Sequence, residues 1–258
     1  MHPARPAEPR KLVFVSVGSA VDMPGANTSI LLVGTNRLLM DCGYAVPPKF
    51  CTRFPDPNFL DGVYLSHQHA DHSFGLPALL AWMKAHGRTR PLTLVHGPGA
   101  KTWIRALLDI GYPGSFEPDV CFEIIWVEVS PEASWEWNKT QLRVAKSIHK
   151  ATNWSLRIDE PGVSVAYSGD GAPSPETQLL FDGVTHLVHE CSWATPLKSG
   201  HGNAETLLSA AGAWNVNTLY LIHVLSTHRT RISSQVASFQ GHVSVKIPRE
   251  GEVISLDE

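Results

Sequence analysis

The sequence predicts an α/β fold of the α+β kind, in which two β-sheets pack face to face and helices cover the outside, a four-layer αββα sandwich. Short apolar strands come in runs along the chain, with amphipathic helices interspersed between them. The 258 residues are 43% hydrophobic and 17% charged, which suits a large core. No linker or internal repeat divides the chain. We therefore expect a single domain over residues 12–258, preceded by a disordered Pro-rich tail over residues 1–11.

The first half of the chain begins with strands and then alternates strands with helices. Two apolar runs flank Gly34-Thr35-Asn36, which predicts a hairpin. Apolar residues recur at helical spacing between Phe74 and His86, and Gly87 follows as a stop signal. The expected strands are Leu12–Val17, Ser29–Val33, Arg37–Met40, Val63–Leu65 and Leu92–Val95, and the expected helices are Phe74–His86 and Pro98–Ile110.

The second half repeats this alternation. The turn sequence Asp159-Glu160-Pro161-Gly162 joins two apolar runs, and Asn203 is a good N-cap for the helix that follows it. The expected strands are Phe122–Val129, Gln141–Ile148, Ser155–Ile158, Val163–Tyr167, His186–His189, Leu219–Ile222, Val243–Ile247 and Glu252–Leu256, and the expected helices are Asn203–Trp214 and Ile232–Phe239.

The composition excludes several classes of protein. The chain has 21 basic and 24 acidic residues, so it lacks the strongly basic field of a dedicated polynucleotide binder. Its four cysteines form no C-x-x-C pair, which argues against a structural zinc ribbon. No run approaches the roughly 20 apolar residues of a membrane span, and the Pro- and Arg-rich residues 1–11 lack the apolar core expected of a secretory signal. We expect a cytoplasmic protein without membrane partners, and a homodimer as the commonest closed assembly.

One short segment is rich in potential metal ligands. The run Ser66-His67-Gln68-His69-Ala70-Asp71-His72 lies between an apolar strand and a helical pattern. Imidazole and carboxylate are ligands that zinc takes in catalytic sites. His67 and His69 share one side of an extended segment, so both can bind one ion. Asp71 and His72 follow the turn, where they can reach a second ion.

A two-metal site needs further ligands from later strand ends. His149, Asp170 and His223 each follow an apolar strand, where loops of layered sheets collect functional residues. Taken alone, such a histidine is usually a surface residue, and an aspartate between glycines is usually a turn former. The combination of all three with the histidine-rich run favours a metal centre.

The order His-x-His-x-Asp-His, then His, then Ser-Gly-Asp, then His resembles the metallo-β-lactamase superfamily from about Val13 to Arg231. The resemblance implies the αββα fold and a site for two divalent ions. Zinc is expected, although manganese and iron suit the same donors. The implied ligands are His67, His69 and His149 for one ion, Asp71, His72 and His223 for the other, and Asp170 between them.

Other motifs resemble the ribonuclease Z group of phosphodiesterases. They include Asp41-Cys42-Gly43, His189-Glu190-Cys191 and His201-Gly202-Asn203. The resemblance implies that His201 assists phosphate cleavage. Two departures concern tRNA. The loop Met23–Asn27 lacks the cations of that group's basic loop, and the segment between the third histidine and the bridging aspartate is too short for its tRNA-binding arm.

The expected reaction is metal-assisted hydrolysis of a small phosphodiester. Two ions lower the pKa of a bridging water, so that hydroxide is available near neutral pH. Asp71 orients or deprotonates this water as well as ligating, and protonated His201 donates to the leaving or phosphoryl oxygen. Glu190 either supports a metal histidine or is a plain buried hydrogen-bonding group.

Three alternatives stay open. The first is hydrolysis of a lactone, thioester or other carbonyl ester on the same metals, for which a tyrosine near the ions would argue. The second is a tRNA 3′-processing endonuclease, which the missing arm and basic loop disfavour. The third is a non-catalytic binding protein, which usually loses ligands. Four tryptophans are candidates either for pocket lining or for ordinary packing: Trp135, Trp137, Trp154 and Trp193.

Overall fold

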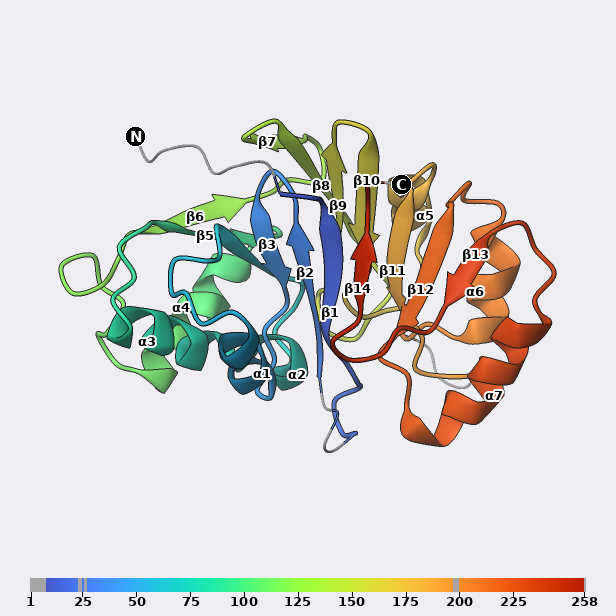
Figure 1. The fold of residues 1–258 in the computed structure, drawn as a ribbon, viewed down its shortest axis with the longest axis horizontal. Coiled ribbons are helices and arrows are strands. Elements are labelled where there is room, and N and C mark those ends of the chain that lie inside the picture. Colours follow the sequence, from blue (N-terminus) through green and yellow to red (C-terminus); the bar gives the residue numbers. More distant parts are fainter. Residues whose placement is uncertain (1–7, 23–24, 26, 197–199, 258) are drawn as a thin grey trace.

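The computed structural model describes residues 8–22, 25, 27–196 and 200–257 and has two seven-stranded sheets that face each other (Figure 1). The first sheet has the order β14-β1-β2-β3-β4-β5-β6. Its strands are β1 (Lys11–Val17), β2 (Thr28–Val33), β3 (Arg37–Met40), β4 (Gly62–Leu65), β5 (Leu92–His96), β6 (Ile124–Glu128) and β14 (Val253–Ser255).

The second sheet has the order β13-β12-β11-β10-β9-β8-β7. Its strands are β7 (Trp135–Trp137), β8 (Thr140–Lys146), β9 (Trp154–Glu160), β10 (Val163–Tyr167), β11 (His186–Glu190), β12 (Thr218–Ile222) and β13 (Ser244–Lys246). In both sheets an antiparallel part adjoins a parallel part: β3 to β6 are parallel, and so are β10 to β13.

Helices cover the outer face of each sheet (Figure 1). The first sheet carries α1 (Val46–Arg53), α3 (Leu76–Ala85) and α4 (Ala100–Gly111), and the short helix α2 (Ala70–Ser73) follows β4. The second carries α5 (Pro175–Phe181), α6 (Ala204–Ala211) and α7 (Ser226–Ser238). Among the described residues, no helix is both long and apolar enough to cross a membrane. The predicted αββα sandwich is confirmed.

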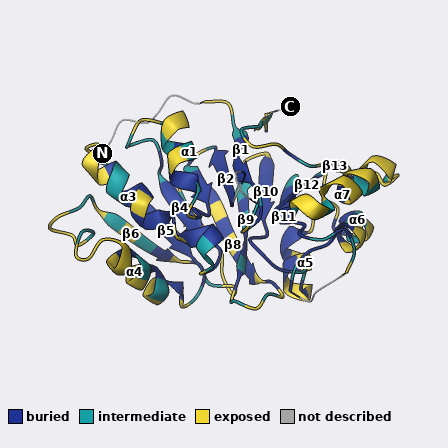
Figure 2. Cartoon of the chain, turned by 90° about the horizontal axis from the view of Figure 1, so that it is seen from below, coloured by how far each residue is buried: buried dark blue, intermediate teal, exposed yellow. Residues whose placement is uncertain are grey.

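Three apolar clusters separate the four layers. The central one lies between the two sheets and includes Phe14, Ile30, Leu156 and Tyr220, all at most 1% exposed. The other two lie between each sheet and its own helices. Figure 2 shows that burial is concentrated in the strands, while the helices are exposed on their outer faces. Burial on both faces explains the continuous apolar runs of these strands.

The sequence does not predict three helices, α1, α2 and α5, and it places the start of α7 too late. The helices α1 and α5 were not predicted, because each begins with proline in its first turn and such residues also suit loops. A capping box of Ser174 and Thr177 begins α5. The predicted helix Ile232–Phe239 begins earlier, at Ser226, because its first turns are polar and solvent-exposed. The predicted helix Phe74–His86 is shorter, and α2 precedes it.

Most of the expected N-terminal tail, residues 1–7, lies outside the described residues. From there the chain is part of the fold, because Arg10 contacts Asp257 and β1 starts at Lys11. Trp135 and Trp137 stack on each other, with ring centroids 5.9 Å apart, and pack against the cluster between the sheets.

The layered core predicts different costs for two matched isoleucine truncations. Ile30 is fully buried between the sheets, whereas Ile110 at the end of α4 is 81% exposed. Ile30→Ala should lower the free energy of unfolding by about 2–5 kcal/mol, because it removes buried methylenes and leaves a cavity. Ile110→Ala should change it by less than about 0.5 kcal/mol. Urea titration followed by circular dichroism measures both values, and equal losses would contradict this account of the core.

Candidate metal centre

The candidate metal centre lies where strands of both sheets end at one edge. His67 and His69 follow β4 of the first sheet, and the short helix α2 places Asp71 and His72 beside them. In the second sheet β8, β10 and β12 run in the same direction. Their carboxyl ends therefore meet at the same edge, and they lead to the other three predicted ligands: His149 after β8, Asp170 after β10 and His223 after β12.

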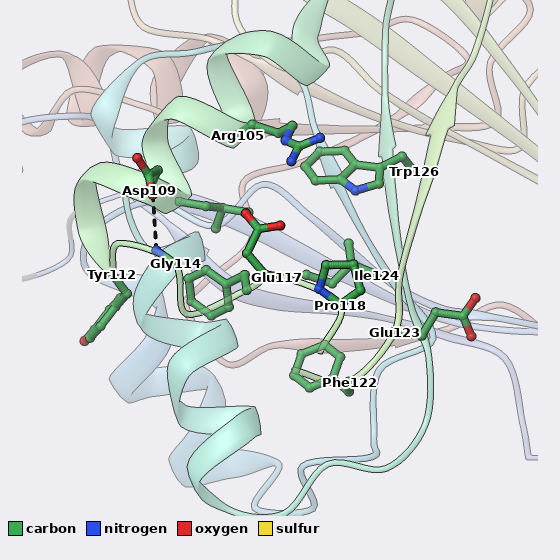
Figure 3. A pocket seen from close by; sticks show the side chains of 12 residues that line it. Arg105, Asp109, Tyr112, Gly114, Glu117, Pro118, Phe122, Glu123, Ile124 and Trp126 are labelled. Carbon is green, nitrogen blue, oxygen red and sulfur yellow. Dashed lines mark hydrogen bonds between the residues drawn. The ribbon is translucent and has the colours of Figure 1, made fainter. Parts of the chain in front are cut away.

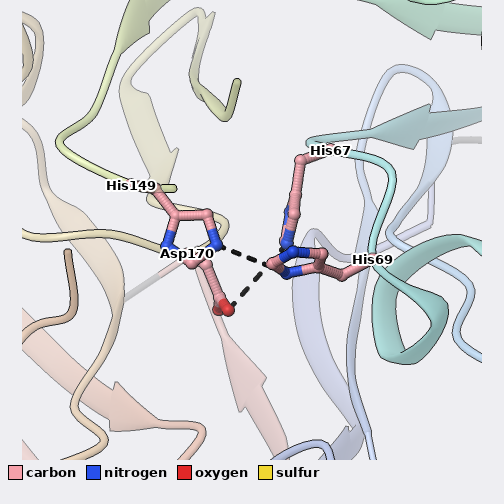
Figure 4. A group of neighbouring side chains, drawn as sticks. All are labelled: His67, His69, His149 and Asp170. Carbon is pink, nitrogen blue, oxygen red and sulfur yellow. Dashed lines mark hydrogen bonds and ion pairs between the residues drawn. The ribbon is translucent and has the colours of Figure 1, made fainter. Parts of the chain in front are cut away.

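The first group of ligands combines three histidines with one carboxylate. His67, His69, His149 and Asp170 each offer a ligand atom within 4.8 Å of the others (Figure 4). His149 Nε2 lies 3.3 Å from His69 Nδ1, and His67 Nε2 lies 3.9 Å from Asp170 Oδ2. The nitrogen atoms thus converge from two sheets on one point beside the carboxylate.

The second group shares Asp170 with the first. Asp71, His72, Asp170 and His223 meet the same 4.8 Å criterion and are all buried. His72 Nε2 lies 3.2 Å from both Asp71 Oδ2 and Asp170 Oδ1, and His223 Nε2 lies 3.2 Å from Asp71 Oδ2. The structure therefore brings all seven predicted ligands together, with Asp170 common to both groups.

The polar atoms at this point fit metal ions. His67 Nε2, His72 Nε2 and Asp170 Oδ1 are buried without a hydrogen bond. Buried polar atoms are rarely left unsatisfied, and each such atom demands a specific explanation. These three belong to the two ligand groups, so bound ions would satisfy them. Imidazole and carboxylate donors suit zinc, manganese or iron.

A second buried carboxylate, Asp41, orients the histidines from behind. Its Oδ2 accepts hydrogen bonds from His72 Nδ1 at 2.7 Å, from the Tyr167 hydroxyl at 2.6 Å and from the Ser66 hydroxyl at 2.6 Å. Its Oδ1 accepts from the Ser66 backbone at 2.7 Å. Asp41 also lies within metal-ligand reach of His67 and His72, but its oxygens are occupied. It therefore holds the His72 ring with Nε2 toward the centre.

The centre also shifts the pKa values of its own groups. Burial and the neighbouring His72 lower the pKa of His67, so this imidazole is neutral. Burial would raise the pKa of Asp71, but the hydrogen bond to His223 and the neighbouring His72 outweigh it and hold the pKa well below its usual range. Burial would lower the pKa of His223, but Asp170 and the hydrogen bond to Asp71 raise it to about 9.

His201 lies beside the centre and is held by Glu190. His201 Nδ1 lies 3.0 Å from Glu190 Oε1. The His201 ring contacts the rings of two predicted ligands, with centroid distances of 4.9 Å to His149 and 6.3 Å to His223. Burial lowers the pKa of His201, but the Glu190 hydrogen bond and charge outweigh this effect and raise it. The His201 side chain is 28% exposed, so it can reach a bound molecule.

Other histidines that might compete as ligands serve different purposes. His189 is buried, bonds the Glu190 carbonyl through Nδ1 at 2.7 Å and stacks on Trp214. The His228 ring packs against Trp193. Neither belongs to the ligand groups found among the described residues.

One cavity lies away from the candidate metal centre, and a second lies beside the segment that carries His149. A cavity of about 480 Å³ between α4, β6 and the intervening loop has Trp126 and Phe122 in its walls and contains none of the seven ligands (Figure 3). A second cavity of about 720 Å³ is lined by Trp154 and by Ser147 and Ile148, the two residues that directly precede His149. Trp154 therefore lines a hollow that borders the metal-ligand segment.

Some residues of the centre escaped the sequence analysis. The sequence shows Asp41 only as part of a motif and predicts no role for Ser66, Tyr167 or Ser192. Their hydroxyl and carboxylate groups act through hydrogen bonds between distant segments, which leave no local pattern. The one local signal is a buried carboxylate at the end of a strand: Asp41 follows β3, and Glu190 is the last residue of β11.

The raised pKa of His223 predicts that metal binding depends on pH. In the metal-free protein, His223 is protonated at neutral pH because its pKa is about 9. A metal ligand must be neutral, so binding must displace this proton. Zinc affinity should therefore rise as the pH increases through about 9, where His223 loses this proton. Calorimetry in buffers of different ionisation enthalpy should find fewer protons released at about pH 10 than at about pH 7. Equal proton release at both pH values would contradict the raised pKa.

The structure is similar to solved metallo-β-lactamase fold proteins. The metallo-β-lactamase fold protein YhfI from Bacillus subtilis superposes with a TM-score of 0.81 at 20% identity, over 96% of this chain and 99% of that one. The short form of human tRNase Z has a TM-score of 0.77 at 17% identity, over 96% of this chain and 100% of that one. At these identities the similarity establishes the fold.

Sequence comparison identifies the family. The ribonuclease Z of Exiguobacterium sp. is 26% identical and covers 83% of this chain and 88% of its own. The uncharacterized protein Rv1339 of Mycobacterium tuberculosis is 31% identical and covers 88% of this chain and 85% of its own. The family described as Anti-Pycsar protein Apyc1 matches residues 10–243. The chain therefore belongs to the Anti-Pycsar protein Apyc1 family, as a ribonuclease Z-like metal-dependent hydrolase of the metallo-β-lactamase fold.

Proposed function

We propose that the protein is a phosphodiesterase that hydrolyses a small phosphodiester at a centre of two divalent ions. The observation that carries this proposal is the pair of ligand groups that share Asp170, with His201 beside both of them. One ion would be held by His67, His69, His149 and Asp170, and the other by Asp71, His72, Asp170 and His223.

The bound ions would lower the pKa of a water and neutralise charge on the phosphoryl oxygens. The protein's own residues would complete the reaction. Asp71 is ionised, so it can accept a hydrogen bond from the attacking water and orient it. His201 binds Glu190 through Nδ1, which leaves Nε2–H free to donate a proton to the leaving oxygen. The carboxylate of Glu190 favours the charged imidazolium needed for this step.

The positions of three tyrosines support phosphodiester over lactone hydrolysis. Tyr167 is buried and its hydroxyl donates to Asp41. The Tyr44 hydroxyl donates to the Ala20 carbonyl at 2.5 Å, and Tyr112 lines the cavity that contains none of the ligands. All three hydroxyls are thus engaged or remote, while a histidine proton donor stands beside the ligand groups.

The substrate is proposed to be small because the segment between His149 and Asp170 has no room for a tRNA-binding arm. The strands β9 and β10 pair up to Glu160 and Val163, so only Pro161 and Gly162 join them. No arm can extend from a two-residue turn. Met23, Pro24 and Ala26 of the loop without cations lie outside the described residues. Relatives and neighbours named ribonuclease Z and a diphosphatase of the PhnP family support chemistry at phosphorus.

A substrate panel tests the proposal. Protein loaded with zinc or manganese should hydrolyse bis-(p-nitrophenyl) phosphate and leave a homoserine lactone and a thioester almost unchanged. Both ions should be tried, since the donors suit either. Clear lactone or thioester opening without phosphodiester turnover would overturn the proposal in favour of carbonyl chemistry.

The proton-donor role of His201 predicts a loss that depends on the leaving group. His201→Ala should lower kcat on diphenyl phosphate by about 10²–10⁴-fold. The loss on bis-(p-nitrophenyl) phosphate should be smaller, because nitrophenolate leaves without a proton. His86→Ala is a matched control, since His86 is exposed and lies outside both ligand groups.

Steady-state kinetics of both variants with both esters separates the two roles of His201. Equal losses on the two esters would show that His201 does not protonate the leaving oxygen. Unchanged activity of His201→Ala would remove it from the mechanism altogether.

A further inference from the structure

We propose that Ser192 is a positioning residue. Through it, the buried carboxylate of Glu190 orients the proposed metal ligand His223, while the same carboxylate binds the proposed proton donor His201 directly. The inference rests on the proposed function, because it assigns His223 to the metal centre. It adds a residue that links the metal side of the site to the proton-donor side.

Glu190 is fully buried at the end of β11, and both of its oxygens are occupied. Oε1 accepts from the backbone of Gly171 at 3.0 Å, the backbone of Gly202 at 2.8 Å and His201 Nδ1 at 3.0 Å. Oε2 accepts from the Ser192 backbone and from the Ser192 hydroxyl, both at 3.0 Å. One oxygen therefore serves His201 and the other serves Ser192.

The direction of these hydrogen bonds follows from the carboxylate. An ionised carboxylate only accepts, so the Ser192 hydroxyl must donate its single proton to Glu190. The lone pairs of Ser192 Oγ then face His223 Nδ1 at 3.1 Å. His223 Nδ1 must carry the hydrogen of this contact, which leaves the Nε2 lone pair for a metal ion. His223 Nε2 indeed faces Asp71 Oδ2 at 3.2 Å and Asp170 Oδ1 at 3.6 Å.

The first sheet contributes the same arrangement to another predicted ligand, His67. There the Ser66 hydroxyl donates to Asp41 Oδ2 at 2.6 Å, and Ser66 Oγ lies 3.0 Å from His67 Nδ1. The order histidine, serine, carboxylate is thus built twice from unrelated segments. A repeated arrangement argues that the serine hydroxyl has a role in orienting the ligand, beyond filling space.

Ser192 is 3% exposed, so water cannot easily replace its hydroxyl. Ser192→Ala would leave His223 Nδ1 without this acceptor and would remove one hydrogen bond from Glu190. Loss of a partner that orients a metal ligand typically lowers metal affinity by about 10–100-fold. We expect Ser192→Ala to lower the affinity for one of the two zinc ions by this factor and to leave the affinity for the other unchanged. Ser192→Thr keeps the hydroxyl and should restore affinity.

Zinc competition with a chromogenic chelator measures both affinities without any substrate. Ser164→Ala is the control, because Ser164 is buried in β10 of the second sheet and its hydroxyl bonds only Thr185 among the described residues. The control should bind zinc like the wild type. If Ser192→Ala bound both zinc ions with wild-type affinity, the inference would be overturned. If Ser192→Ala does not fold, Ser192→Cys keeps the volume with a weaker hydrogen bond and should show an intermediate loss.

A spectroscopic readout tests the orientation itself. In ¹⁵N-histidine spectra of the zinc-loaded protein, the His223 ring, assigned by His223→Gln, should show a proton on Nδ1. A proton on Nε2 would contradict the arrangement. The two proposals fail separately: absent phosphodiester turnover would overturn the function alone, whereas wild-type zinc binding of Ser192→Ala would overturn the role of Ser192 alone.

Discussion

Two buried carboxylates, one at the end of a strand in each sheet, hold the metal centre together. Burying a charge is costly unless it is fully hydrogen-bonded. Asp41 accepts four hydrogen bonds and Glu190 accepts five from the described residues, so neither is left unsatisfied. Their donors come from segments far apart in the sequence. Asp41 of the first sheet accepts from Tyr167 of the second, so the two sheets must pack in one relative position for Asp41 to be satisfied.

This constraint reaches the backbone around the ligands. Asp41 and His223 adopt positive φ values of 61° and 57°, which are uncommon for residues with a side chain. Such strain persists only where the surroundings hold it, and His223 is held by its backbone bond to Val17 of the first sheet. Gly43 allows the loop to approach: a Cβ there would lie 1.9 Å from the Asp71 carbonyl oxygen. The positive φ values of Asp41 and His223 and the close approach of Gly43 to Asp71 all occur at or beside the candidate ligands.

The candidate ligands could be named from the sequence because His67, His149, Asp170 and His223 follow apolar strands, and His69, Asp71 and His72 lie in the same short run as His67. The fold was predictable from the alternation of strands and helices. Ser66, Tyr167 and Ser192 could not be predicted, since a hydroxyl gains its role only when the fold brings a carboxylate and an imidazole to it. The helices α1 and α5 were missed because their prolines suit loops equally well.

The shared carboxylate of Asp170 joins the two groups of side chains into one candidate centre, and the proposed hydrolysis requires both groups to act together. Anomalous diffraction at the zinc absorption edge, from crystals grown with zinc, tests this claim most directly. The account predicts two peaks, one beside His67, His69 and His149 and one beside Asp71, His72 and His223, with Asp170 between them. A single peak, or peaks away from these side chains, would contradict it.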